Sequence, residues 1–137
     1  MKRIFALALV TALLLIAMIP QVQAVEWETY KNPKGRFEMK YPADWKCTEG
    51  GFMVIVTFEG PNGISASVRA IHDKSEFTKV GKEHVDSTTT VGGHTTRTVH
   101  ICGEKYGGIF VFSAPKKDFD SANKTYFDPM IKSVKVK

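Results

Sequence analysis

Cysteine is scarce in this sequence of 137 residues, which contains only Cys47 and Cys102. The two lie far apart and form no C-x-x-C motif, so the usual signature of thiol–disulfide redox chemistry is missing. A disulfide-dense mini-protein is excluded for the same reason. At most, the two cysteines can form a single bridge with each other.

Familiar catalytic motifs are also missing. The chain has no G-x-S-x-G elbow, G-x-G-x-x-G turn or P-loop, and the segment 82–86 does not match H-E-x-x-H. Neither cysteine stands at a spacing that would pair it with a histidine base. The sequence therefore predicts a protein that is not an enzyme.

Only one long apolar run is present, from Ile4 to Ile19, and Lys2 and Arg3 precede it. The run is followed by Val22-Gln23-Ala24, which has small residues where signal peptidase requires them. We therefore predict a cleaved signal peptide over 1–24, with a retained N-terminal anchor as the alternative. The product would be periplasmic, lumenal or extracellular, with a single domain over 25–137.

Export bears on the cysteines, because compartments outside the cytosol are oxidising. A lone pair in such a compartment favours a structural disulfide between Cys47 and Cys102. Two free, buried thiols are the alternative.

Charge is nearly balanced. Without Lys2 and Arg3, the formal net charge of +5 falls to +3. This mild excess does not require a nucleic-acid partner. The basic residues near the N-terminus and at the C-terminus either form a solvated rim or face an acidic partner or membrane surface.

Strand patterns dominate the predicted domain. Phe37, Met39 and Tyr41 alternate with charged residues, which is typical of a strand with one buried face, and Pro42 ends it. The segments 52–59 and 106–113 are apolar on both faces, which predicts central strands covered on both sides. Helical spacing predicts a helix over 73–85, and Asp128-Pro129 predicts the start of a short second helix.

Acidic residues near the C-terminus suggest one metal site. Asp118 and Asp120, with Asn123 and Asp128 nearby, supply the hard oxygen ligands that calcium prefers. The EF-hand pattern is not met, since Ala122 and Asn123 stand where that loop needs a ligand and then glycine. A solvated acidic loop capping the last helix is the alternative. His94 and His100 lie about 20 Å apart on one strand, too far to share an ion.

Several motifs resemble the PsbP-like family, named after an extrinsic subunit of the oxygen-evolving complex. They are the segment 35–45 ending in Tyr-Pro-Ala-Asp-Trp, Gly93-His94 at a late strand, and Phe127-Asp128-Pro129 near the end. The resemblance implies an α+β fold whose central antiparallel sheet carries helices on both faces. It also implies a non-catalytic accessory domain that binds or stabilises a protein partner. An extracytoplasmic metal-binding protein is the alternative function.

Overall fold

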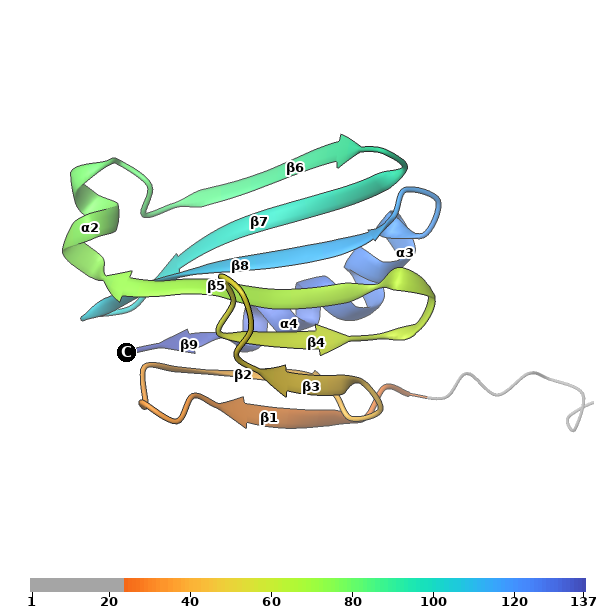
Figure 1. Ribbon diagram of the computed structural model, residues 1–137, viewed down its shortest axis with the longest axis horizontal. Coiled ribbons are helices and arrows are strands. Elements are labelled where there is room, and N and C mark those ends of the chain that lie inside the picture. The colour runs from red at the N-terminus through yellow and green to blue at the C-terminus, as the bar shows by residue number, and fades with distance from the viewer. Residues whose placement is uncertain (1–23) are drawn as a thin grey trace, which may run out of the picture.

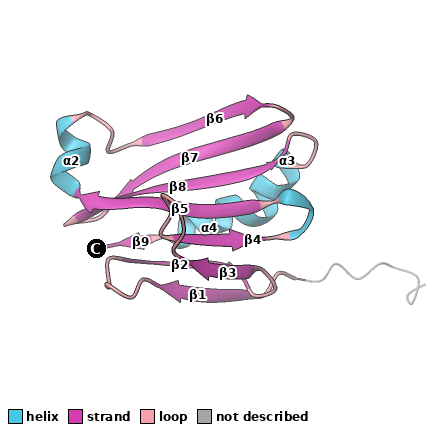
Figure 2. Ribbon diagram, in the orientation of Figure 1, coloured by secondary structure: helices cyan, strands magenta, loops and turns pink. Residues whose placement is uncertain are grey.

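The structure is a computed structural model that describes residues 24–137. Apart from Ala24, the expected signal peptide lies outside the described residues. Strands dominate the described chain and form two antiparallel sheets, one of three strands and one of six (Figures 1 and 2). No helix in this part of the chain is long and apolar enough to cross a membrane.

The three-stranded sheet contains β1 (Trp27–Lys31), β2 (Phe37–Pro42) and β9 (Lys135–Val136), in the order β1-β2-β9. The expected alternation in β2 is confirmed, because Phe37 and Met39 are buried while Lys40 is exposed. Pro42 ends the strand as predicted. The C-terminal strand joins this sheet by pairing Phe37 with Val136.

The six-stranded sheet has the order β3-β4-β5-β8-β7-β6. Its strands are β3 (Lys46–Glu49), β4 (Val56–Glu59), β5 (Ser65–Asp73), β6 (Val85–Val91), β7 (His94–Cys102) and β8 (Tyr106–Pro115). The 3₁₀ turn η1 (Pro61–Gly63) joins β4 to β5, and helix α2 (Lys74–Lys79) follows β5. The long hairpin β7–β8 therefore lies between β5 and the edge strand β6 (Figure 1).

The core lies on one face of the large sheet. The C-terminal segment, α3 (Phe119–Ala122), the π-helical turn η2 (Asn123–Phe127) and α4 (Asp128–Ser133), packs there together with the small sheet. Phe112 contacts Phe127 with ring centroids 5.3 Å apart, and Phe37 contacts Phe110 at 5.8 Å. One apolar cluster thus joins both sheets and the C-terminal helices.

The opposite face of the large sheet is largely open. Ile109 and Val111 of β8 are only half-buried there, among serine and threonine side chains of neighbouring strands. Phe77 of α2 covers one end, where it packs against Gly107. The antiparallel α+β fold is as expected. The expected helices on both faces of the sheet are not found within residues 24–137. Short hydroxyl side chains on this face bury too little apolar surface to hold a helix.

Three other predictions are corrected. The strand expected over 52–59 begins only at Val56, and Phe52 is exposed. The helix expected over 73–85 ends at Lys79, because Gly81 leaves helical geometry with φ 65°, and Val85 already starts β6. The short helix predicted at Asp128-Pro129 is present as α4, but it continues directly from η2 and Asp128 is not its N-cap, because the preceding residue Phe127 is itself helical.

Candidate functional site

The loop between β3 and β4 presents two adjacent large apolar side chains to solvent. Phe52 is 90% exposed and Met53 is 72% exposed. We call these two residues the apolar tip. A single exposed apolar side chain is common on protein surfaces. An aromatic residue and a methionine side by side at a loop tip are typical of a surface that contacts another molecule.

Backbone geometry holds this loop in shape. Gly50 and Gly51 have φ angles of 77° and 125°, and Met53 has a φ of 55°. The Gly50 N–H donates to the Ile55 carbonyl oxygen over 2.8 Å, which closes the loop at its base. A Cβ atom added at Gly51 would lie 2.9 Å from Val54 Cγ2. The two glycines therefore allow a turn that points Phe52 and Met53 outward.

A small pocket of about 220 Å³ lies between the base of this loop and the β1–β2 turn. Lys34, Arg36 and Glu49 line it, together with apolar side chains from Ile55 and Ile71. Arg36 also lies over the Tyr106 ring, 5.1 Å from its centroid. Both signs of charge thus lie beside apolar surface, which is the mixture found at the rim of protein interfaces.

Tyr30 adds a polar group to this pocket. Burial, and then the neighbouring Glu49 carboxylate, raise the pKa of Tyr30 to about 12. The phenol therefore keeps its proton at any physiological pH and is suited to donate a hydrogen bond rather than to act as a base.

A second polar cluster surrounds Arg97 of β7. Arg97 Nε and Nη2 donate to the two carboxylate oxygens of Asp86 over 2.9 and 2.7 Å. Its Nη1 donates to Asn123 Oδ1 and Asp128 Oδ1 over 2.7 and 2.6 Å. The guanidinium hydrogen bonds lower the pKa of Asp86 and raise that of Arg97. Because these donors and acceptors satisfy one another, the cluster joins the β6–β7 hairpin to the C-terminal helices.

The same cluster bears on the predicted calcium site. Asn123 and Asp128 are engaged by Arg97, while Asp118 and Asp120 lie at the start of α3. Within residues 24–137 no group of three or more His, Cys, Asp or Glu side chains is arranged to hold a metal ion. Calcium binding by Asp118 and Asp120 stays a prediction, which calorimetry with the Asp120→Ala variant would test.

The predicted disulfide is absent, and both cysteines are free. Cys47 pairs with Phe58 on the core face, whereas Cys102 pairs with Gly107 on the open face. Three strands also separate β3 from β7, so the two strands themselves lie about 19 Å apart and the cysteines are well beyond disulfide reach. Burial raises the pKa of each thiol, which disfavours the reactive thiolate.

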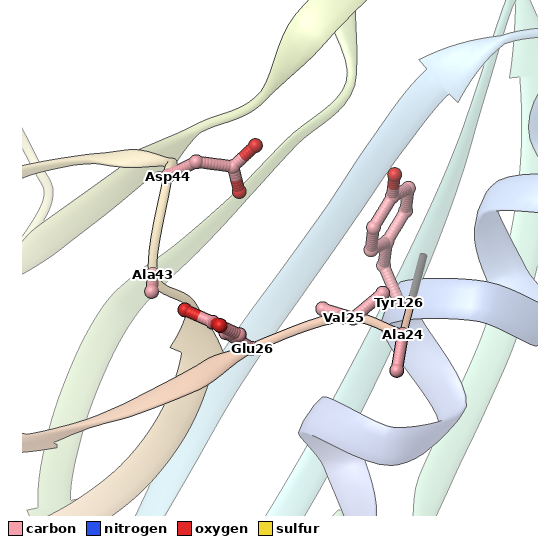
Figure 3. A pocket seen from close by; sticks show the side chains of 6 residues that line it. All are labelled: Ala24, Val25, Glu26, Ala43, Asp44 and Tyr126. Atoms are coloured by element: carbon pink, nitrogen blue, oxygen red, sulfur yellow. The ribbon is translucent and has the colours of Figure 1, made fainter. Parts of the chain in front are cut away.

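A wide hollow of about 920 Å³ opens beside the start of the described chain. Asp44 of the β2–β3 turn and Tyr126 of η2 stand on either side of it (Figure 3). Glu26 supplies a second carboxylate, and the remaining lining residues are Ala24, Val25 and Ala43. Among the described residues, the lining contains no histidine or cysteine.

Two histidines lie on the open face beside Phe77, in a hollow of about 260 Å³. His72 Nδ1 lies 3.4 Å from Glu76 Oε2, and His100 Nδ1 lies 2.8 Å from the Lys82 carbonyl oxygen. Neither is hydrogen-bonded to a serine, threonine or cysteine side chain in the described part of the chain. The arrangement lacks the nucleophile–base contact that acyl transfer requires.

Comparisons with known proteins agree on fold alone. No family model matches the chain, and no curated protein does. A crystal structure from Bacteroides thetaiotaomicron matches with a TM-score of 0.57 at 14% identity, covering 85% of this chain and 49% of that one. The solution structure of cyanobacterial PsbP (CyanoP) from Synechocystis sp. PCC 6803 matches with a TM-score of 0.47 at 15% identity, covering 88% and 98%.

One of these two structures is of a PsbP protein, the family that the sequence motifs resemble. The described chain spans about half the length of the Bacteroides protein. At such low identity nothing about activity or partners carries over.

Sequence reasoning missed the apolar tip and the Arg97 cluster. For the tip, the signal was Gly50-Gly51 directly before the apolar run, a turn composition that separates Phe52 and Met53 from the strand. For Arg97 no local signal exists, because its partners lie 11 to 31 residues away.

Proposed function

We propose that this protein is an exported, non-catalytic domain of PsbP-like type that binds a protein partner through the apolar tip. The observation that carries the proposal is the exposure of Phe52 and Met53, at 90% and 72%, on a loop whose glycines fix its shape. The family motifs in the sequence support an accessory role, and the N-terminal segment supports export.

The chemistry around the tip favours a protein surface as the partner. Aromatic, methionine and arginine side chains are enriched at protein interfaces, and all three are gathered here as Phe52, Met53 and Arg36. The pocket beside the tip could take one side chain of the partner, with Arg36 and Glu49 available for charged contacts. Covering the Phe52 ring would contribute about 2–3 kcal/mol of hydrophobic free energy.

A preformed loop also suits binding. Because Gly50 and Gly51 already hold the turn, less conformational entropy is lost when a partner covers it. Mutations in the tip should therefore change binding without changing the fold.

Site-specific photo-crosslinking in the native compartment would test the proposal. A photoreactive residue replaces Phe52, and a matched one replaces Lys117, which is exposed in the loop between β8 and α3. We expect one discrete adduct with a different protein from position 52 and none from position 117. In the purified pair, Phe52→Ser should weaken binding at least tenfold. No discrete adduct at position 52, or equal adducts at both positions, would refute the proposal.

A further inference from the structure

Strand β6 is an exposed edge of the large sheet with little to prevent another strand from pairing with it. It is the last strand of the large sheet and pairs with β7 alone among the described strands, running along the upper edge in Figure 1. Six of its seven residues are exposed. The opposite edge strand, β3, is only four residues long and carries Lys46 and Glu49. By contrast, β6 contains no proline or lysine and a single charge, so it lacks the usual devices that prevent strand pairing.

The turn after β6 determines which backbone groups are free. Gly92 and Gly93 have φ angles of 59° and 79°, as a two-residue type I′ turn requires. Such a turn closes on a hydrogen-bonded pair, here Val91 and His94. Hydrogen-bonded pairs then alternate along the ladder, so residues 85, 87, 89 and 91 bond to β7. The N–H and C=O groups of Asp86, Thr88 and Thr90 point away from the sheet.

A side-chain contact agrees with this assignment. Thr90 Oγ1 lies 2.9 Å from Thr95 Oγ1 of β7. Directly opposite side chains approach most closely in pairs whose backbones are not hydrogen-bonded to each other. Thr90 is therefore one of the residues whose backbone faces outward.

The segment Val-Asp-Ser-Thr-Thr-Thr-Val is complementary to itself when two copies run antiparallel about Thr88. Thr88 then faces Thr88 of the second copy, and Asp86 faces Thr90. The outward-facing backbone groups of Asp86, Thr88 and Thr90 then lie opposite those of Thr90, Thr88 and Asp86 of the second copy. About six backbone hydrogen bonds can therefore form between the two strands. A register centred on Thr88 thus satisfies the free groups of both edges.

Side chains fit the same register. Val91, which is 74% exposed, would lie beside Val85 of the second copy, and Ser87 would lie beside Thr89. Pairs of β-branched and hydroxyl side chains stabilise neighbouring strands. The two Asp86 carboxylates would face threonines rather than each other, and each is already neutralised by Arg97.

We propose that β6 pairs with β6 of a second copy of this chain, forming a two-fold dimer with one continuous antiparallel sheet. The interface is a single strand pair, smaller than the roughly 1,200 Å² that stable complexes bury. The dimer is therefore weak and depends on protein concentration. This surface is separate from the apolar tip, so the inference does not depend on the proposed function.

Sedimentation velocity of the protein, purified after expression of the full sequence, would test the dimer from micromolar to millimolar concentration. We expect a monomer–dimer equilibrium that Thr88→Lys weakens at least tenfold, because two like charges would then face each other. The control is Thr48→Lys on the exposed β3 edge, which should leave the equilibrium unchanged, as should Phe52→Ser. Circular dichroism would establish that each variant is folded.

Charge reversal provides a rescue. Thr88→Glu should also be monomeric, whereas an equal mixture of Thr88→Lys and Thr88→Glu should form the dimer again. A wild-type protein that stays monomeric at all concentrations would refute the proposal. A β6 edge that binds an extended peptide, but not a second copy of the chain, would refute it too. A dimer that Thr88→Lys leaves unchanged, or a mixture that stays monomeric, would refute it as well.

Discussion

Arg97 of β7 and Asp86 of β6 form a two-point ion pair, with Nε–Oδ1 and Nη2–Oδ2 distances of 2.9 and 2.7 Å. The planar guanidinium matches the carboxylate, and its remaining edge reaches Asp128 of α4. The Arg97 side chain therefore links the β6–β7 hairpin to the C-terminal helix α4, and its loss should destabilise both elements.

Replacing Arg97 with lysine should destabilise the fold by about 1–3 kcal/mol, because an ammonium group cannot reproduce the fork. The side chain of Arg97 is only 15% exposed, so water cannot fully replace its partners. Urea denaturation would measure the change, with Arg69→Lys at an exposed position of β5 as the control. Equal midpoints for wild type and Arg97→Lys would contradict the linking role.

The same pair predicts a pH dependence. Hydrogen bonding to Arg97 lowers the pKa of Asp86 in the folded state. The stabilisation from Asp86 is therefore fully present above the unfolded value of about 3.9 and is lost as pH falls through the lowered folded value. Asp86→Asn should be less stable than wild type at pH 7, and the difference should shrink in strong acid. Denaturation curves at pH 7 and below pH 3 would reveal this, and a difference independent of pH would contradict it.

Both thiols should be free in the purified protein. Alkylation in denaturant without prior reduction should add two labels per chain, as read by mass spectrometry. Alkylation of the folded protein should be slow, because burial raises the pKa of Cys47 and Cys102. A chain that takes up label only after reduction would show that the cysteines are paired after all.

The conformation of the apolar tip should depend on the glycines of its loop. Gly51→Ala should destabilise the loop by about 1 kcal/mol or more, because φ 125° is closed to residues with a Cβ atom. Phe52→Ser should change unfolding free energy by less than about 0.5 kcal/mol, since the ring is exposed. Partner binding should fall in both variants. If Gly51→Ala binds the partner as wild type does, the shape of the loop does not matter for binding.

Local patterns were enough for the strands in which one residue type alternates with another. The alternation of Phe37 and Met39 with Glu38 and Lys40 predicted β2, and the burial of the two apolar residues confirms it. Period-2 burial is a property of a single strand, so neighbours in sequence suffice to detect it. The antiparallel class followed from the same patterns.

Pairing between distant segments decided the rest. Whether Cys47 and Cys102 meet depends on strand order and on the face each occupies, and three intervening strands keep them apart. Phe52 is as apolar as Phe58, yet a turn places one in solvent and the other in the core. Arg97 finds its partners only once β6 and the C-terminal helix are in place. The sequence by itself determined the alternating strand β2 and the antiparallel α+β class, whereas tertiary packing decided which side chains are exposed, because exposure depends on which elements pack against each other.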